Sequence, residues 1–237
     1  MFQYEKAWQD ARARIVAAAR ACGRDAASIR LLAVSKAHPA AAVRALHALG
    51  QRAFGENYVQ EASAKMDALA DLGDVEWHFI GPLQSNKTAL AAARFAWVHT
   101  IEREKIARRL SEARPPTLPP LAVCVQVNIS GEPAKSGVAP DEAVALARLV
   151  AALPRLSLRG LMGIAEETAD THRQRAQFRV LAECAAACRA AGLSIDTLSM
   201  GMSADLESAI AEGATLVRLG TALFGPRAPA AAAAAIV

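Results

Sequence analysis

Short apolar runs alternate with amphipathic stretches along most of the chain. Eight of these runs predict buried strands, because they are short, apolar and bounded by polar or turn-forming residues. They cover residues 31–35, 52–55, 76–80, 95–99, 121–128, 158–164, 196–200 and 215–220. Between them apolar residues recur at helical spacing, which predicts helices that begin near residues 39, 57, 86, 102, 140, 171 and 203.

The two ends of the chain lie outside this alternation. Within residues 1–28 the apolar positions follow helical spacing, at Ala7, Trp8, Ala11, Ile15 and Ala18. This spacing predicts an additional N-terminal helix before the first strand. Residues 228–237 are rich in alanine and form a tail after the last predicted strand.

The alternation of strands and helices predicts parallel pairing, because a parallel connection needs a crossover and a helix supplies it. Eight such units in 237 residues match a closed TIM-type (β/α)8 barrel, for which about 250 residues is typical. An open doubly wound sheet would instead predict a glycine-rich turn after the first strand. The residues after LLAVS are KAHP. We therefore predict an α/β fold, in which residues 1–237 form a single barrel domain with an extra N-terminal helix.

Composition and charge narrow the class of protein. The chain is 53% hydrophobic, and its 27 basic and 23 acidic residues give a net charge of +4 that is spread along the sequence. This excess is too small to favour binding to nucleic acid. The N-terminal segment carries charges from its fifth residue, and no stretch approaches the roughly 20 apolar residues of a membrane span. We expect a soluble, cytoplasmic protein.

The cysteines, the tryptophans and most of the histidines show no pattern of a site. Cys22, Cys124, Cys184 and Cys188 fit neither a disulfide framework nor a metal site. Trp77 and Trp97 lie in predicted strands, where we expect them to pack between the barrel and its helices. Four histidines are expected at surface or helix positions, namely His38, His47, His99 and His172.

Polar residues follow most of the predicted strands. In barrels of this type the chemistry takes place at the carboxyl ends of the strands, so these residues are the candidates for a site. They are Lys36, Glu56, Asn57, His78, Thr100, Asn128, Ser199, Arg218, Gly220 and Thr221. For any one of them, exposure of the strand end to water is a sufficient explanation. The combination of Lys36, Arg218 and a glycine-rich last unit favours a binding site.

The last two units predict an anion site. DTLSMGMS (residues 196–203) and TLVRLGTALFG (residues 215–225) place hydroxyls and glycines where helices begin. Backbone N–H groups at a helix start, beside glycines that allow close approach, bind phosphate well. The loops after strands seven and eight commonly hold a phosphate in these barrels. The first inference is therefore a phosphorylated ligand.

Lys36 ends the first strand, which adjoins the eighth when a barrel closes. Partial burial near cations such as Arg218 is expected to lower its pKa, and a neutral amine condenses with an aldehyde to a Schiff base. An aldehyde and a phosphate on one molecule indicate pyridoxal 5'-phosphate, or else a sugar phosphate in a class I aldolase. Arg218 can only donate, so it would leave a pyridine nitrogen unprotonated. An aldolase would want acids near the amine, and Glu56 is the only nearby candidate.

Seven segments carry a resemblance to a known family. They are LLAVSK, FGENYVQE, WHFIGPLQSNK, KSGV, RGLMGI, LSMGMSADLESAI and VRLGTALFG, and the match runs in order from about residue 5 to residue 227. They resemble the pyridoxal phosphate homeostasis proteins, whose fold is similar to the N-terminal barrel of alanine racemases, the fold type III barrel of pyridoxal phosphate enzymes. The chain departs from the usual pattern in the AHP after Lys36 and in GLMGIAEE, which concern only the rim of the site.

The resemblance implies a set of cofactor ligands. It implies that Lys36 is the Schiff-base lysine and that Arg218 is the partner of the pyridine nitrogen. Ser199, Gly220 and Thr221 are implied to be phosphate ligands, with Gly201 beside them. The ring pocket is implied to be lined by Asn57, His78 and Met200. A hydrogen-bonded core position is the alternative for His78.

The same resemblance implies binding and supply of pyridoxal phosphate in vitamin B6 homeostasis, without a defined reaction. Recipients would be apo forms of enzymes that use this cofactor, and we expect a monomer. An amino-acid racemase or decarboxylase is the alternative. Related racemases need a further domain for their second base, and the chain ends at Val237, directly after the eighth unit. Lys135, in the loop after the fifth strand, is a further hypothesis, as an amine that accepts the cofactor from Lys36.

Overall fold

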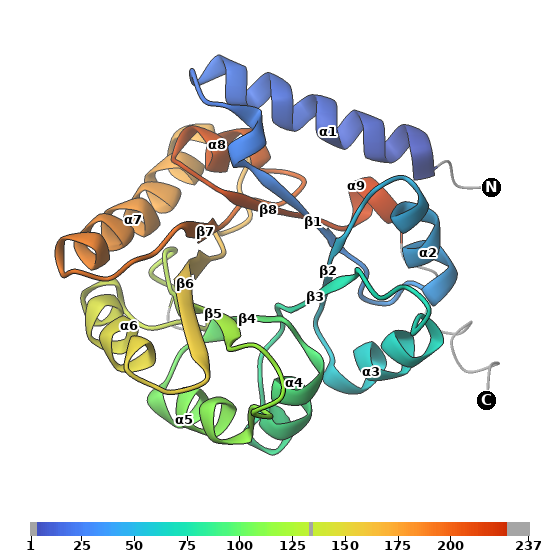
Figure 1. Cartoon of the computed structure of the whole chain (residues 1–237). Coiled ribbons are helices and arrows are strands. Elements are labelled where there is room, and N and C mark those ends of the chain that lie inside the picture. Colours follow the sequence, from blue (N-terminus) through green and yellow to red (C-terminus); the bar gives the residue numbers. More distant parts are fainter. Residues whose placement is uncertain (1–3, 133–134, 227–237) are drawn as a thin grey trace.

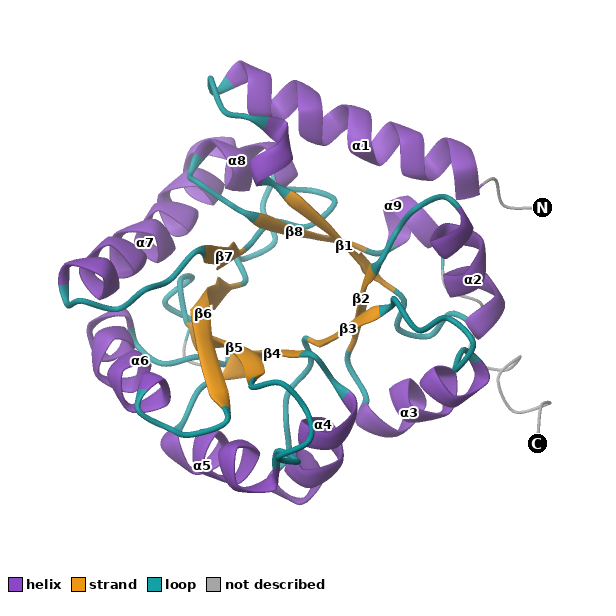
Figure 2. Ribbon diagram, in the orientation of Figure 1, coloured by secondary structure: helices purple, strands orange, loops and turns teal. Residues whose placement is uncertain are grey.

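The computed structural model describes residues 4–132 and 135–226, and the predicted alanine-rich tail lies outside them. In the described residues eight parallel strands form a closed barrel, and β8 pairs back onto β1. The strands are β1 (Arg30–Val34), β2 (Ala53–Glu56), β3 (Glu76–Phe79), β4 (Trp97–Ile101), β5 (Leu121–Val127), β6 (Leu156–Gly163), β7 (Thr197–Ser199) and β8 (Leu216–Leu219). Each overlaps one predicted run, and the predicted barrel is confirmed (Figure 2).

Helices surround the barrel on its outside, as Figure 1 shows. They are α1 (Tyr4–Ala21), α2 (Ala40–Ala48), α3 (Val59–Ala68), α4 (Thr88–Arg94), α5 (Glu104–Ala113), α6 (Ala143–Ala151), α7 (Thr171–Ala190), α8 (Leu206–Ala211) and α9 (Thr221–Phe224). Short 3-10 helices lie at Ala26–Ser28, Ser85–Lys87 and Pro140–Glu142. The predicted N-terminal helix is α1, which packs against α8 and α9.

The core has two faces, because successive side chains of a strand point to opposite sides. Ala33 and Val217 join the main apolar cluster, which also contains residues of the surrounding helices. Leu32 and Leu216, each one residue earlier, form a separate small cluster. These two therefore point into the barrel, and β5 is buried at all seven of its positions, as a strand covered on both faces should be.

Trp97 belongs to the interior of the barrel, where it clusters with Ala122, Cys124 and Met162. Our expectation that it packs between barrel and helices is wrong. Trp77 does lie in the outer cluster, where its ring is 6.0 Å from that of Phe54. Both tryptophans are buried, one on each side of the barrel wall, so burial alone does not distinguish inside from outside in the sequence.

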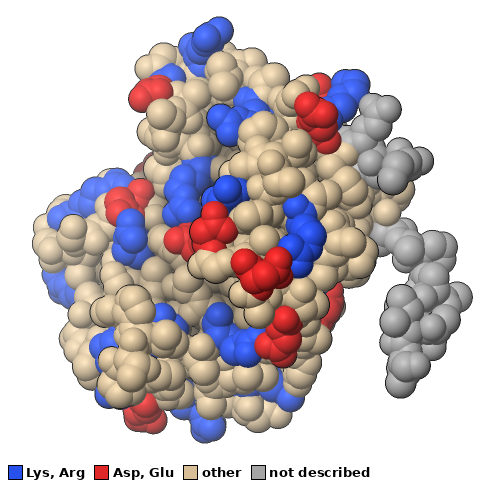
Figure 3. Space-filling view, turned by 45° about the vertical axis from the view of Figure 1, so that its right-hand side comes forward, with Lys and Arg blue, Asp and Glu red and all other residues tan. Residues whose placement is uncertain are grey.

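The outer surface carries charges of both signs. Figure 3 shows Lys and Arg intermingled with Asp and Glu over the face that it presents. Among the described residues, no helix is long and apolar enough to cross a membrane. Within the same residues, no group of His, Cys, Asp and Glu side chains is arranged to hold a metal ion.

Candidate functional site

A cavity of about 590 Å³ opens at the carboxyl ends of the strands. Five of the predicted site residues line it, namely Lys36, Asn57, Arg218, Gly220 and Thr221. They come from the ends of β1, β2 and β8, which are adjacent in the closed barrel. Barrel closure thus brings together residues from the two halves of the sequence, and the volume suits a small-molecule ligand.

Lys36 follows β1 and is held by contacts to the residues on either side of it. The Ser35 hydroxyl donates to Glu56 at 2.6 Å, and the Ser35 carbonyl accepts from the Lys65 ammonium at 2.8 Å. On the other side the Ala37 N–H donates to Glu61 at 2.7 Å. These contacts fix the backbone from which the Lys36 side chain extends.

The backbone turns sharply after Lys36. Ala37 has a φ of 60°, in the left-handed region that side chains other than glycine rarely adopt. The strained residue is held by the hydrogen bond from its own N–H to Glu61. Strain of this kind persists where the surrounding structure enforces it, and it gathers at functional sites.

A buried ion pair underlies these contacts. The Lys65 ammonium of α3 lies 2.5 Å from Glu56 of β2, and the two side chains are 5% and 0% exposed. Burial raises the pKa of Glu56, and the ammonium of Lys65 works against that rise. The pair lies between strand and helix, beside the cavity and outside the barrel wall.

Arg218 reaches the cavity from β8 and is otherwise buried. Its Nη1 donates to the Ser199 carbonyl at 2.6 Å and to the Ser199 hydroxyl at 2.9 Å, and its Nη2 donates to the Gly163 carbonyl at 3.0 Å. Burial lowers the pKa of Arg218 to about 10, so the group stays charged at neutral pH. A guanidinium has no acceptor, and any ligand atom that it contacts must therefore be an acceptor.

Asn57 offers the complementary group. Its Oδ1 is buried and has no hydrogen-bond partner among the described residues, although buried polar atoms are normally paired. Gly81 lets the loop after β3 press against Asn57, because a Cβ at Gly81 would come within 2.2 Å of the Asn57 carbonyl oxygen. The close approach at Gly81 therefore keeps Asn57, and its acceptor oxygen, at the cavity wall.

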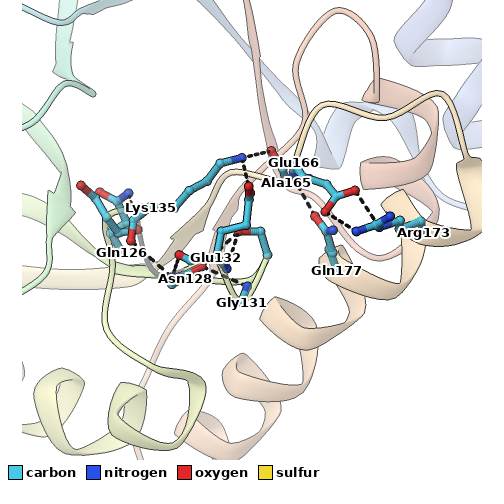
Figure 4. A network of polar contacts seen from close by, with 11 residues as sticks. Gln126, Asn128, Gly131, Glu132, Lys135, Ala165, Glu166, Arg173 and Gln177 are labelled. Atoms are coloured by element: carbon cyan, nitrogen blue, oxygen red, sulfur yellow. Dashed lines mark hydrogen bonds and ion pairs between the residues drawn. The ribbon is translucent and has the colours of Figure 1, made fainter.

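Two loops form the rim of the cavity opposite Lys36. Lys135, in the loop after β5, lies 3.0 Å from Glu132 and donates to the Ala165 carbonyl, in the loop after β6, at 3.4 Å. Figure 4 shows the Lys135 side chain spanning from one loop to the other. Glu166 continues the rim and forms an ion pair with Arg173 of α7 at 2.6 Å. Lys135 also lines the cavity, so the site holds two lysines.

Comparison with known proteins shows to which family this chain is related. Residues 10–228 match the family described as alanine racemase, N-terminal domain. The pyridoxal phosphate homeostasis protein of Pseudomonas aeruginosa is 60% identical over 215 residues, covering 91% of this chain and 92% of that protein. The protein of the same name from Escherichia coli K12 is 52% identical over 218 residues, covering 91% and 93%.

The chain belongs to the pyridoxal phosphate homeostasis protein family. Among solved structures it is similar to PipY of Synechococcus elongatus PCC7942 with PLP bound, at 40% identity and a TM-score of 0.78. That match covers 90% of this chain and all of PipY. The predicted family and the barrel that it implied are both confirmed.

Four of the residues implied by the family resemblance do not line the cavity, namely His78, Ser199, Met200 and Gly201. His78 and Ser199 are fully buried. His78 lies two residues before Ile80, which does line the cavity, and side chains two residues apart share one face. His78 is thus one layer below the cavity, in the hydrogen-bonded core position considered as its alternative.

His99 is a residue that sequence reasoning missed. We expected a surface or helix position, and the structure corrects this. His99 is fully buried inside the barrel, in contact with His78 and Ser199. The two-residue spacing from Trp97 places both side chains on the same face of β4, but the sequence does not show that this face is the inner one. Lys65 and Glu61 were also missed, because charges on an amphipathic helix normally indicate its solvated face.

Proposed function

We propose that this protein binds pyridoxal 5'-phosphate in the cavity and acts in the homeostasis of that cofactor in the cytoplasm. One observation carries the proposal: a lysine, a donor-only arginine and an asparagine with an orphaned buried oxygen line the same cavity. These groups fit an aldehyde, a pyridine nitrogen and a phenolic hydroxyl. The names of the relatives and the PLP bound in the PipY structure support the same ligand.

Each of these residues has a distinct task in the proposed site. Lys36 supplies the amine for a covalent bond to the aldehyde carbon, with loss of water. Arg218 donates to the ring nitrogen and keeps it unprotonated, and Asn57 accepts a hydrogen bond from the ring hydroxyl. When bound, the cofactor supplies an electron sink, which an unprotonated ring nitrogen weakens. This arrangement favours holding the cofactor over using it in a reaction.

Gly220 and Thr221 are proposed to hold the phosphate. Both line the cavity beside Lys36, and the Thr221 side chain is exposed and able to donate. The nearby Ser203 hydroxyl also lines the cavity. Ser199, Met200, Gly201 and His78 were predicted as direct ligands. In our proposal they act from the layer beneath.

A carrier or regulator fits better than an enzyme. The close relatives are named for homeostasis and carry no reaction in their names. We propose a monomer that supplies apo forms of pyridoxal phosphate enzymes. Lys135 shares the cavity with Lys36. We propose that during hand-over the Lys135 amine would add to the carbon bonded to Lys36 and displace the Lys36 amine, so that one carbon–nitrogen bond forms as the other breaks. If Lys135→Ala passes bound cofactor to an apo-enzyme at the wild-type rate, this role fails.

The experiment is reduction of the loaded protein with borohydride, followed by peptide mass spectrometry. We expect an added pyridoxyl phosphate group on Lys36. Lys36→Ala should lose the visible absorption of the bound cofactor, whereas Lys105→Ala, a control at an exposed lysine of α5, should keep it. A colourless protein that takes up no label would overturn the proposal and favour an aldolase-type site.

A further inference from the structure

A chain of hydrogen bonds runs through the barrel interior beneath the cavity. Arg218 Nη1 donates to Ser199 Oγ at 2.9 Å, and Ser199 Oγ lies 2.8 Å from His99 Nδ1. His99 Nε2 lies 2.9 Å from His78 Nδ1, and His78 Nε2 lies 2.8 Å from Glu76 Oε1. The chain links β8, β7, β4 and β3 and ends at Glu76, the first residue of β3.

The position of each proton in the chain follows from its two ends. Arg218 can only donate, and an ionised carboxylate can only accept. Glu76 is such a carboxylate: its hydrogen bond to His78 lowers its pKa to about 2, and Arg30 donates to the same oxygen at 2.6 Å. His78 therefore carries its proton on Nε2, and its Nδ1 is an acceptor.

The same reasoning fixes the upper half of the chain. His99 must donate from Nε2 to His78 Nδ1, so its own Nδ1 accepts from the Ser199 hydroxyl. Ser199 Oγ in turn accepts from Arg218. Both imidazoles are neutral in this arrangement, and both are fully buried, where burial disfavours the charged form. Every donor points from Arg218 toward Glu76.

A second proton on either ring would disrupt this order. If His78 were charged, its Nδ1 would donate to His99, and His99 would donate to Ser199 Oγ. Ser199 would then accept from both His99 and Arg218, and its own proton would lose its acceptor. The neutral arrangement is the one in which every group of the chain is paired.

We propose that Ser199, His99 and His78 are positioning residues that hold the Arg218 guanidinium for the ring of the cofactor. This inference rests on the function proposed above and goes further, because it assigns these residues to support and not to direct contact. Nη1 donates to Ser199, and one N–H of Nη2 donates to Gly163. The remaining N–H groups of the guanidinium are the ones that can donate to a ligand in the cavity that Arg218 lines.

The first test needs no cofactor. Nitrogen NMR of the ligand-free protein with labelled histidine separates the two tautomers and the charged form. We expect His78 and His99 to be neutral at pH 7 with protons on Nε2, assigned by comparison with His78→Leu and His99→Leu. A charged signal, or the opposite tautomer for either ring, would overturn the proposed chain.

The second test compares pyridoxal phosphate with pyridoxal, which lacks the phosphate. Loss of a buried hydrogen bond costs about tenfold in affinity, and Ser199→Ala should weaken both ligands by that factor, because both present the ring to Arg218. A phosphate ligand at Ser199 predicts weakening of pyridoxal phosphate alone. His99→Leu should behave like Ser199→Ala, and His99→Gln, which keeps a donor and an acceptor, should recover part of the affinity and the wild-type visible spectrum.

The outcomes separate the two proposals. If the wild-type protein takes up no cofactor on Lys36, the proposed function fails, whatever the NMR shows. If the wild type is labelled on Lys36 but Ser199→Ala and His99→Leu bind both ligands as it does, the positioning role fails and the function stands. Unchanged thermal unfolding of Ser199→Ala shows that a lost affinity is local.

Discussion

Two buried polar networks next to the cavity are built from different groups. The one beside Lys36 lies between β2 and α3 and is ionic, with the Lys65 ammonium 2.5 Å from Glu56 and 3.3 Å from Glu61. The one beneath Arg218 lies inside the barrel, and its middle is formed by two neutral imidazoles and a hydroxyl. The first fixes the backbone on either side of Lys36, and the second contacts the Arg218 guanidinium.

The difference between the networks corresponds to what each must hold. Near Lys36 the groups to be fixed are a backbone carbonyl and a backbone N–H, and full charges bind such groups strongly. Near Arg218 the group to be fixed is already charged and buried. A further charge there would have to lie in the barrel interior without solvent, where desolvation is costly. Neutral hydrogen-bonding groups in a fixed order can hold the Arg218 guanidinium with a smaller desolvation cost.

The largest effect is expected from removing one partner of the ionic network. Lys65→Met leaves Glu56 buried without its cation, which costs about 3–5 kcal/mol of unfolding free energy. Urea unfolding measures this loss. The double variant Glu56→Gln with Lys65→Met removes both charges and should recover most of the stability. A loss below about 1 kcal/mol in the single variant would mean that the pair is solvated.

A smaller effect is expected from the neutral network. His99→Leu leaves the Ser199 O–H without an acceptor and His78 Nδ1 without a donor, at a cost of about 2–3 kcal/mol. His78→Leu should cost a similar amount. Because both substitutions break the same hydrogen bond, the double variant should cost about 0.5–3 kcal/mol less than the sum. Additive losses in urea unfolding would argue against a continuous chain.

The pH dependence of stability gives a third comparison. Burial lowers the pKa of both His78 and His99 below 6.5, against the opposing effect of Glu76 on His78, and Arg30 and Arg218 reinforce the lowering. The unfolded chain therefore binds more protons below pH 6.5, and folding stability falls as the pH decreases. The slope approaches about 1.4 kcal/mol per pH unit for each histidine.

The matched control is the double variant His78→Leu with His99→Leu. Between about pH 6.5 and pH 5, before most carboxylates titrate, its unfolding free energy should vary less with pH than that of the wild type. The measurement is urea unfolding at several pH values. Equal slopes in the two proteins would show that the imidazoles take up protons in the folded state.

The smallest effect concerns the strained residue next to Lys36. Ala37→Gly removes the cost of the left-handed conformation, which stabilises the folded state. The added chain entropy of the unfolded state offsets part of this effect. We expect a net gain of about 0.5–1 kcal/mol in unfolding free energy. Ala41→Gly, on an exposed position of α2, is the control and should lose about 0.5–1 kcal/mol. If Ala37→Gly also loses stability, the turn carries no strain.

The sequence pattern was sufficient for the barrel, because the alternation of strands with helices leaves few other arrangements. It also predicted that Lys36 and Arg218 come together, since strand ends converge on one face, and both line the cavity. It did not separate layers within the barrel. His78 and Ser199 stand near strand ends yet lie beneath the cavity. Trp97 faces inward, which the sequence of a strand buried on both sides does not reveal. Lys65 was hidden by its place on an amphipathic helix.

The pairing of β1 with β8 has a consequence for protein synthesis. Lys36 leaves the ribosome early, whereas Arg218 and Thr221 are added near the end of the chain, and they meet only when the last strand closes the barrel. Contacts between such distant segments form late in folding. Binding of the cofactor at the proposed site should therefore occur only after translation is complete and the barrel has closed. A truncated chain would present the lysine without the residues that make it a site.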